Sequence, residues 1–426
     1  MADSVARAAA DMGGPAAGIL DLSQPVRDLC LFMVAGEHSG DALGAKLMQA
    51  LNQARPGRVR YLGVGGALMT AEGLTSQFPL SDVAVMGLGA ILARMPRLVR
   101  RVHQTVDATI AARPDALVII DSPEFTHAIA RRLRRRNPQI PIVAYVSPSV
   151  WAWRSGRARR MRAYVDHVLA LLPFEPAAHA SFGGPPCTYV GHPLIERLDW
   201  VAALDPTPLV ERLRLSPTRP TLVVLPGSRR SEVGRLLQPF GEAIDLLGRA
   251  GRLPQLIIPV VDHVQGAVEQ HVSRWPFVPH IVTDEADKWR AFKLARAALA
   301  ASGTVTLELA LAGTPMVVAY RVEPLMAPFL RRMIKAPTII LPNLVLGEQP
   351  FKEYVQEDCT GEALAGALLD VMSDGPIRAR QLAALARVPP LMRLPKGSPS
   401  EAAGRVVLAY AERTREQRRR MANVHA

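Results

Sequence analysis

Residues 28–41, DLCLFMVAGEHSGD, decide the fold class of this chain. The stretch begins with an apolar run, 28–35, that is typical of a buried strand, and the small residues after it are typical of a tight loop. Leu43, Leu47 and Leu51 then recur at helical spacing. The stretch therefore predicts a strand, a loop and a helix, which is the repeating unit of a parallel sheet covered by helices.

The same unit recurs along the chain. Apolar runs that predict further strands lie at 59–64, 116–120, 141–146, 167–172, 221–225, 255–260, 280–283, 297–301 and 316–322. Continuous apolar strands that alternate with amphipathic helices indicate parallel sheets buried on both faces. We therefore expect an α/β protein with two doubly wound domains and a ligand site between the carboxyl ends of their strands.

The domain boundaries follow from interruptions of this alternation. A stretch with several prolines separates the two series of strands. We expect an N-terminal extension at 1–28, a first domain at 29–204, a linker at 205–220, a second domain at 221–370, helices at 371–412 and a basic tail at 413–426.

Composition excludes several classes of protein. The 426 residues are 49% hydrophobic, so the chain can fill a core and is not a disordered polymer. Three cysteines, Cys30, Cys187 and Cys359, lack paired spacing, which argues against a disulfide scaffold or a structural zinc site. The net charge of +13 fits a nucleic acid, an anionic membrane or a phosphorylated substrate, and charge alone does not choose among them.

No segment predicts a membrane span or a secretory signal. The uncharged stretches 137–153 and 176–195 are interrupted by prolines and glycines. Residues 1–28 lack a basic start followed by an apolar block. We therefore expect a cytoplasmic protein.

Two loops of the second domain have the composition of phosphate sites. Each follows a predicted strand and opens a predicted helix, where free N–H groups favour an anion. The loop 226–233 adds the guanidinium of Arg229, which suits a diphosphate. The loop 301–308 places Glu308 one turn into its helix, where it fits ribose hydroxyls. Simple helix capping is the alternative for the loop 301–308, and the presence of two such loops favours the nucleotide.

An acidic residue ends the third strong strand. Asp121 follows a buried strand, so its carboxylate must be hydrogen-bonded, paired or used chemically. Glu124 has a simpler explanation, because an acid in a first helical turn interacts favourably with the helix dipole. Asp121 is therefore our candidate general base.

Two further stretches admit more than one interpretation. The segment 147–154, SPSVWAWR, and the arginines after it suit stacking on bases, a phosphosugar or lipid headgroup, or a core position for Trp151. The apolar run 83–93 is followed by Arg94, Arg97, Arg100 and Arg101. It predicts either ordinary core or a surface that rests on an anionic bilayer.

Taken together, the motifs strongly resemble the lipid-A-disaccharide synthase family. The resemblance runs from about residue 31 into the C-terminal helices, and YVSPSVWAW at 145–153 is its most specific string. Its other strings are AGEHSGD at 35–41, LSDVAVMG at 80–87, DSPEF at 121–125, LPFE at 172–175, VGHP at 190–193, LPGSRRSEV at 225–233, SGTVTLEL at 302–309 and LPN at 341–343.

The resemblance implies a GT-B glycosyltransferase, with two facing Rossmann-like domains and the UDP-sugar held mainly by the second. It implies inverting transfer from UDP-2,3-diacylglucosamine to the 6-hydroxyl of 2,3-diacylglucosamine 1-phosphate, at the cytoplasmic face of the anionic inner membrane. The UDP-sugar is a substrate, so neither a cofactor nor a metal is expected. The sequence leaves open whether the protein forms a homodimer.

The resemblance also implies roles for individual residues. Asp121 is expected as the base. The residues expected to hold the nucleotide are Ser228, Arg229, Ser302, Gly303, Thr304, Glu308 and Asn343. Those expected on the acceptor side are Gly36, Glu37, Ser39, Gly40, Ser147 and Trp151.

Two rival functions would use the same features. Another GT-B transferase or a UDP-sugar 2-epimerase would share the phosphate loops, and an epimerase needs no lipid surface. A nucleic-acid-binding module would use the arginines around Trp151 and Trp153, and its binding would fall steeply with salt. The resemblance argues against a nucleic-acid partner.

Overall fold

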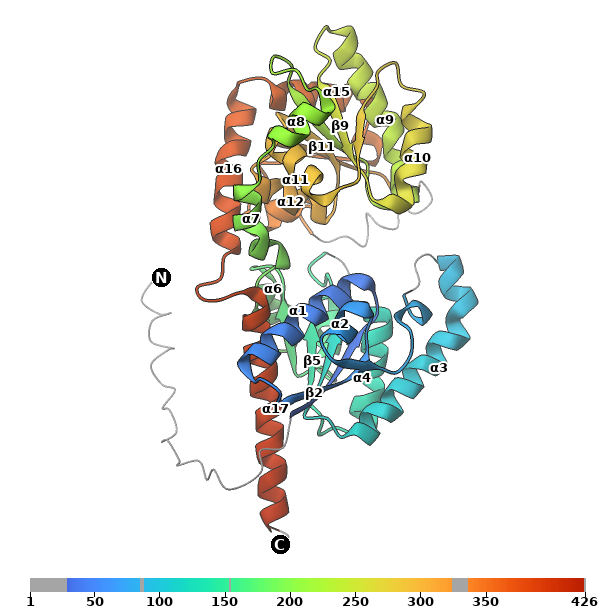
Figure 1. Cartoon of the computed structure of the whole chain (residues 1–426), viewed down its shortest axis with the longest axis vertical. Coiled ribbons are helices and arrows are strands. Elements are labelled where there is room, and N and C mark those ends of the chain that lie inside the picture. The colour runs from blue at the N-terminus through green and yellow to red at the C-terminus, as the bar shows by residue number, and fades with distance from the viewer. Residues whose placement is uncertain (1–28, 85–87, 153–154, 324–335, 425–426) are drawn as a thin grey trace.

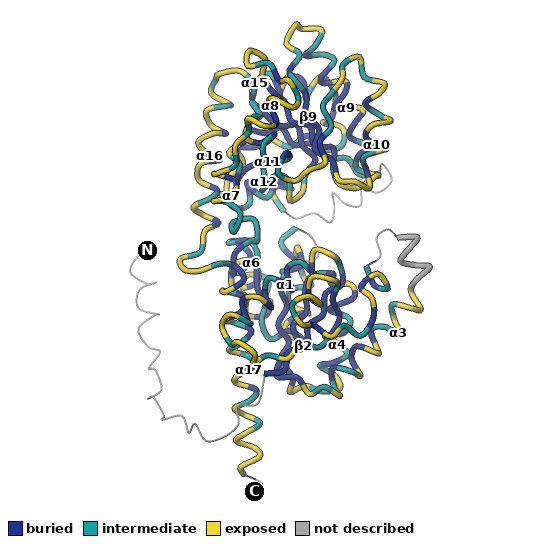
Figure 2. Tube along the Cα trace, in the orientation of Figure 1, coloured by how far each residue is buried: buried dark blue, intermediate teal, exposed yellow. Residues whose placement is uncertain are grey.

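The structure, a computed structural model, describes residues 29–84, 88–152, 155–323 and 336–424. The chain forms two lobes, and each lobe is a parallel sheet with helices packed around it (Figure 1). Strands buried from end to end lie at the centre of both lobes (Figure 2). This architecture confirms the predicted fold class.

Within the described residues, the first sheet has seven parallel strands in the order β3-β2-β1-β4-β5-β6-β7. The strands are β1 (Leu29–Ala35), β2 (Val59–Val64), β3 (Leu74–Ser76), β4 (Ala116–Ile120), β5 (Ile142–Tyr145), β6 (His167–Ala170) and β7 (Cys187–Tyr189). The helices are α1 (His38–Ala54), α2 (Ala67–Ala71), α3 (Leu88–Ala112), α4 (Pro123–Arg136), α5 (Gly156–Met161) and α6 (Glu175–Ser181). Helices cover both faces of the sheet, which explains why β1 and β4 are apolar at every position.

The second sheet has six parallel strands among the residues described, in the order β10-β9-β8-β11-β12-β13. They are β8 (Thr221–Leu225), β9 (Gln255–Pro259), β10 (His280–Val282), β11 (Ala297–Ala301), β12 (Met316–Tyr320) and β13 (Glu353–Val355). The helices are α9 (Arg230–Arg249), α10 (Asp262–Val272), α11 (Glu285–Leu294), α12 (Thr304–Ala312), α14 (Leu341–Leu346), α15 (Gly361–Met372) and α16 (Pro376–Met392).

The segment that leaves the first lobe contacts both lobes. It forms the 3-10 turn η2 (Pro193–Arg197), then α7 (Leu198–Ala203) and α8 (Thr207–Leu213), whose Val201 and Leu209 lie in the core of the second lobe. Glu196 accepts a hydrogen bond from Lys46 of α1, at 2.6 Å. The next residue, Arg197, is ion-paired with Glu285 of α11. Two adjacent side chains therefore connect η2 to opposite lobes.

A second crossing, between α16 and the last helix, returns the chain to the first lobe and packs against the first crossing. The Tyr189 hydroxyl donates to the carbonyl of Met392, and the Ser400 hydroxyl donates to Glu196 at 2.8 Å. Gly191 has a φ of 89°, and an added Cβ would lie 2.9 Å from Pro399 Cγ. Glycine is required there because the two crossings approach so closely.

The last helix, α17 (Pro399–Val424), lies along the first lobe (Figure 1). Ala403, Val407 and Ala411 are fully buried in the same core cluster as Leu47 and Leu51 of α1. The residues from 413 to 424, which we expected as a basic tail, continue this helix. α17 is therefore part of the core of the first lobe.

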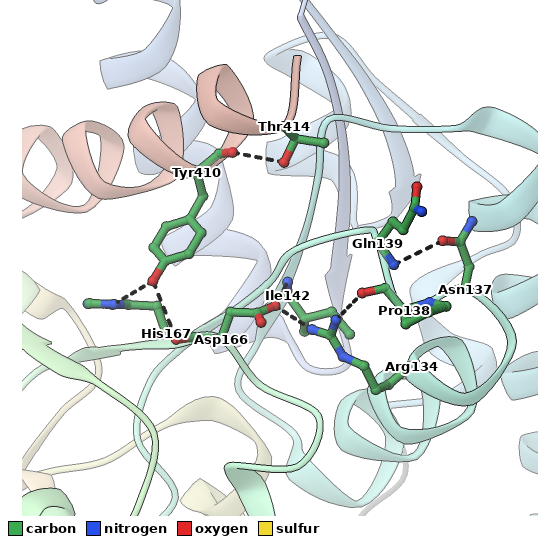
Figure 3. A network of polar contacts seen from close by, with 9 residues as sticks. All are labelled: Arg134, Asn137, Pro138, Gln139, Ile142, Asp166, His167, Tyr410 and Thr414. Atoms are coloured by element: carbon green, nitrogen blue, oxygen red, sulfur yellow. Dashed lines mark hydrogen bonds and ion pairs between the residues drawn. The ribbon is translucent and has the colours of Figure 1, made fainter. Parts of the chain in front are cut away.

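Polar contacts add to this packing at the amino ends of β5 and β6 (Figure 3). The Tyr410 hydroxyl shares a hydrogen bond of 3.2 Å with His167 Nδ1. The neighbouring Asp166 carboxylate accepts from the backbone N–H of Ile142 at 2.7 Å and is ion-paired with Arg134. The contacts lie at the edge of the sheet opposite the strand ends that carry Asp121.

None of the described helices has a stretch that is both long and apolar enough to cross a bilayer.

Replacing Val407 by Asp should unfold the first lobe preferentially. The change places a carboxylate in a fully buried site between α17 and α1, and we expect a loss of about 3 kcal/mol or more in the free energy of unfolding. Urea denaturation followed by circular dichroism measures this loss. Ala409→Asp, at an exposed position of the same helix, is the control and should change the stability by less than about 0.5 kcal/mol.

Candidate active site

A cavity of about 490 Å³ lies at the carboxyl edge of the second sheet. Residues that follow β8, β9, β10 and β11 line it, together with the first turns of α11 and α12. The lining includes nearly all the residues expected to hold a nucleotide, namely Ser228, Arg229, Ser302, Gly303, Thr304 and Glu308. The structure thus brings the two predicted phosphate loops to one site.

The loop before α9 is organised by a carboxylate from the first turn of that helix. Glu232 Oε2 accepts from the N–H groups of Ser228 at 3.2 Å and Arg229 at 3.3 Å. Arg229 Nη1 donates to Glu232 Oε1 at 3.0 Å, and the Arg229 side chain remains 66% exposed. Gly227 has a φ of 109°, and an added Cβ would lie 2.6 Å from Glu232 Oε2. The loop therefore requires glycine, and its guanidinium is accessible to a ligand.

Glu308 is held by a lysine that the sequence analysis missed. Lys288 Nζ, from α11, lies 3.0 Å from Oε1 and 3.1 Å from Oε2 of Glu308, and both residues line the cavity. No motif marks Lys288, because it comes from a helix rather than from a strand-end loop. The ion pair fixes the Glu308 carboxylate one turn into α12 and brings a second cation to the site.

Ser302 and Asn343 occupy different places. Ser302 lines the cavity, and its hydroxyl donates to the carbonyl of Ile339 at 2.8 Å. Asn343 is 1% exposed, and its amide group donates to Thr338 and Phe351 and accepts from the Phe351 N–H. Asn343 does not line the cavity, so the structure does not bring it together with the other expected nucleotide ligands.

The first lobe places Glu37, Ser39 and Asp121 together at the ends of β1 and β4. The Ser39 hydroxyl donates to Asp121 Oδ2 at 3.3 Å. Gly36 allows this approach, because an added Cβ would lie 2.5 Å from Ser122 Cβ. Gly40 is similarly confined, with an added Cβ at 3.2 Å from the carbonyl oxygen of Ile120.

The electrostatics of Glu37 indicate that the two lobes face each other here. Burial raises the pKa of the Glu37 carboxyl, and the charges of Asp121 and Glu124 raise it further. The Arg229 guanidinium, from the other lobe, lowers the same pKa. Glu37 and Arg229 therefore interact electrostatically across the gap between the lobes.

Ser147 and Trp151 lie over a buried polar cluster that the sequence analysis did not identify. Trp151 Nε1 donates to Glu175 Oε1 at 3.3 Å, and the Ser147 hydroxyl shares a hydrogen bond of 2.9 Å with His179 Nε2. Burial raises the pKa of Glu175 to about 7, although the N–H groups of Leu172 and Trp151 favour its charged form. The motif LPFE contained the signal for Glu175, whereas His179 belongs to no motif.

Among the residues described, no three His, Cys, Asp or Glu side chains come together as a group that could hold a metal ion.

Comparison with known sequences identifies one family. A family model described as "Lipid-A-disaccharide synthetase" matches residues 31–388. The lipid-A-disaccharide synthase of Rhodopseudomonas palustris strain BisB18 is 52% identical over 378 residues, which cover 89% of this chain and 94% of that protein. That of Bradyrhizobium diazoefficiens is 50% identical over 385 residues, covering 90% and 97% respectively.

Comparison with solved structures supports the fold. The UDP-GlcNAc 2-epimerase from Neisseria meningitidis bound to UDP-GlcNAc has a TM-score of 0.60 at 11% identity, covering 90% of this chain and all of that chain (100%). The calicheamicin glycosyltransferase CalG4 has a TM-score of 0.51 at 17% identity, covering 91% and 99%. Both show that the two-lobed arrangement is shared by epimerases and glycosyltransferases, and neither decides the reaction.

Replacing Glu175 by Gln should change how stability depends on pH. Ionising Glu175 is harder in the folded protein than in the unfolded chain, where its pKa is 4.5, so the native protein loses stability as pH rises from about 4.5 through about 7. Relative to Glu175→Gln, the wild type should lose about 3 kcal/mol over this range. Urea denaturation at pH 5 and pH 8 measures this difference, and equal pH dependence of the two proteins would contradict it.

Proposed function

Because the chain belongs to the lipid-A-disaccharide synthase family, we propose that it joins UDP-2,3-diacylglucosamine to 2,3-diacylglucosamine 1-phosphate. The chain is a glycosyltransferase of lipid A disaccharide synthesis, and the products of this reaction are lipid A disaccharide 1-phosphate and UDP. The observation that carries the proposal is the position of Asp121 and Glu37 on one lobe opposite Arg229 and the cavity on the other.

The second lobe binds the UDP part of the donor. The diphosphate lies between the loop at Arg229 and the start of α12, where a guanidinium and free helical N–H groups offset its charge. Glu308, held by Lys288, accepts hydrogen bonds from the ribose hydroxyls. The same positive groups stabilise the charge that develops on UDP as it leaves, and this role requires no cofactor.

The first lobe activates the acceptor. Asp121 takes the proton of the 6-hydroxyl while that oxygen attacks C1 of the donor sugar, and Ser39 orients the carboxylate. The new bond between O6 and C1 forms as the bond from C1 to UDP breaks on the opposite face, so the configuration at C1 inverts in a single displacement. A positioned base of this kind contributes roughly 10²- to 10⁴-fold to the rate.

The acyl chains of both substrates require that the reaction take place at the membrane surface. Each buried methylene contributes about 0.8 kcal/mol, so moving a whole chain into water is prohibitively costly. Residues 85–87 of the apolar run 83–93 lie outside the described part of the chain, as do the side chains of 88–94. The next turn of α3 exposes Met95 and Val99 beside Arg97, a mixture suited to an anionic bilayer at the cytoplasmic face of the inner membrane.

Asp121→Asn should lower the rate of disaccharide formation by about 10²- to 10⁴-fold and leave UDP binding within about twofold of the wild type, because only the base is lost. The measurement is the conversion of UDP-2,3-diacylglucosamine and 2,3-diacylglucosamine 1-phosphate, presented in mixed micelles, into tetraacyl disaccharide and UDP. The wild type must form this product for the function to stand. Wild-type protein that epimerises UDP-GlcNAc instead would refute the proposed function. Normal turnover by Asp121→Asn would refute the assignment of Asp121 as the base.

Arg229→Ala should weaken UDP binding by about 10- to 100-fold, since it removes a charge-assisted contact to the diphosphate. Isothermal titration calorimetry with UDP measures this change. Arg230→Ala is the matched control, because Arg230 is the next residue and its guanidinium donates to the carbonyl of His263 instead. Equal UDP affinities of the wild type and Arg229→Ala would remove Arg229 from the diphosphate site.

A further inference from the structure

A buried carboxylate, Glu175, connects three segments of the first lobe. It is the first residue of α6 and is 4% exposed. Its Oε2 accepts from the N–H groups of Leu171 and Leu172, both at 3.0 Å, directly after β6. Its Oε1 accepts from Trp151 Nε1 at 3.3 Å, in the loop that follows β5. One side chain thus holds the loops after two adjacent strands together.

Other groups around this carboxylate also face the loop after β5. The Ser147 hydroxyl lies between Glu175 and His179, within hydrogen-bonding distance of His179 Nε2. From β7, Cys187 and Tyr189 are close enough for the charge on Glu175 to raise the pKa of each, in addition to the effect of burial. These contacts place Glu175 at the centre of a polar cluster beneath residues 147–151.

The loop above this cluster is packed between the two lobes. The rings of Trp151 and Phe174 meet edge to face, with centroids 5.3 Å apart. Both rings pack against the core cluster of the second lobe, which includes Val201 of α7. The loop therefore lies where movement of one lobe relative to the other would be transmitted to it.

The same loop is joined to the candidate base through the sheet. Val146, the residue between β5 and the loop, has a φ of 82°, which is unfavourable for a β-branched side chain. Asp121 has a φ of 52°, and its N–H donates to the carbonyl of Tyr145, the last residue of β5. The conformations of the two strand ends are therefore coupled through this hydrogen bond.

We propose that Glu175 is a positioning residue for the transfer reaction, because its carboxylate holds the loop 147–151 in place and thereby sets the acceptor side of the cleft beside Asp121. The proposal rests on the function proposed above. It assigns Glu175 no contact with either substrate, since its oxygens are occupied by the loop and by the turn after β6.

Protonation should weaken this role. A carboxylate accepts at both oxygens, and a protonated carboxyl has one acceptor fewer for the three N–H donors. Burial places the pKa of Glu175 at about 7, so the hold on the loop is complete above this pH and is lost as pH falls through it. Turnover should fall over the same range.

The test compares Glu175→Gln with the wild type in the disaccharide assay. We expect kcat/KM for the acceptor to fall by about tenfold or more, with UDP affinity within about twofold of wild type, because the nucleotide cavity belongs to the other lobe. In the wild type, turnover should fall as pH falls through about 7. In the variant, this fall in turnover should be absent. Trp151→Phe keeps the ring, removes the N–H donor, and should change the same parameters in the same direction.

Asp166→Asn is the matched control. Asp166 also accepts from the backbone N–H of a strand, that of Ile142, but at the opposite edge of the same sheet (Figure 3). Its loss should lower stability and leave kcat/KM for the acceptor within about twofold of the wild type. The control separates a role in positioning from a general loss of stability in this lobe.

Several outcomes would overturn the inference. The first is a kcat/KM for the acceptor in Glu175→Gln that stays within about twofold of the wild type. The second is a loss of UDP affinity as large as the loss of kcat/KM. The third is a fall in turnover near pH 7 that is the same in Glu175→Gln as in the wild type. If Glu175→Gln does not fold, the test uses Trp151→Phe, with the same comparison of kcat/KM for the acceptor and of UDP affinity. Failure of the wild type to make any disaccharide would refute the proposed function itself, whereas the ratio of variant to wild type tests Glu175 alone.

Discussion

The site depends on how closely the backbone can approach itself at the carboxyl ends of parallel strands. At Gly36 and Gly227 a Cβ would overlap Ser122 and Glu232, so only glycine permits these turns. Asp121, Ser122 and Val146 are left-handed without being glycine, each at a cost of about 1 to 3 kcal/mol. The stability of the buried sheets offsets this strain. The strained turns bring the polar groups of the first lobe together, opposite Arg229 of the second lobe.

Much of the fold and of the candidate site could be predicted from the sequence. Every run that we predicted to be a strand became one, because a strand buried on both faces must be largely apolar. The strands that were missed, β3, β7 and β13, have three residues each, LTS, CTY and EYV, and lie at or near sheet edges, where an apolar run is not needed. The two loops that line the cavity could be picked out in the sequence because glycine and hydroxyl residues after a strand form a local pattern.

The features that could not be predicted arise from contacts between distant segments. Lys288, which pairs with Glu308 across two helices, has no local signature. The motif containing Asn343 was recognised, but a sequence does not show that its amide is already satisfied by Thr338 and Phe351. The apolar face of α17 is visible as a pattern, whereas its partner, α1, lies more than 300 residues earlier in the chain.

The return of α17 also constrains the order in which the protein can fold during synthesis. Ala403, Val407 and Ala411 belong to the same core as β1 and α1, so that core lacks part of its apolar surface until α17 leaves the ribosome. All described strands of the second lobe, and its helix α16, are by contrast translated before α17. The lobe that starts first is therefore the one that finishes last.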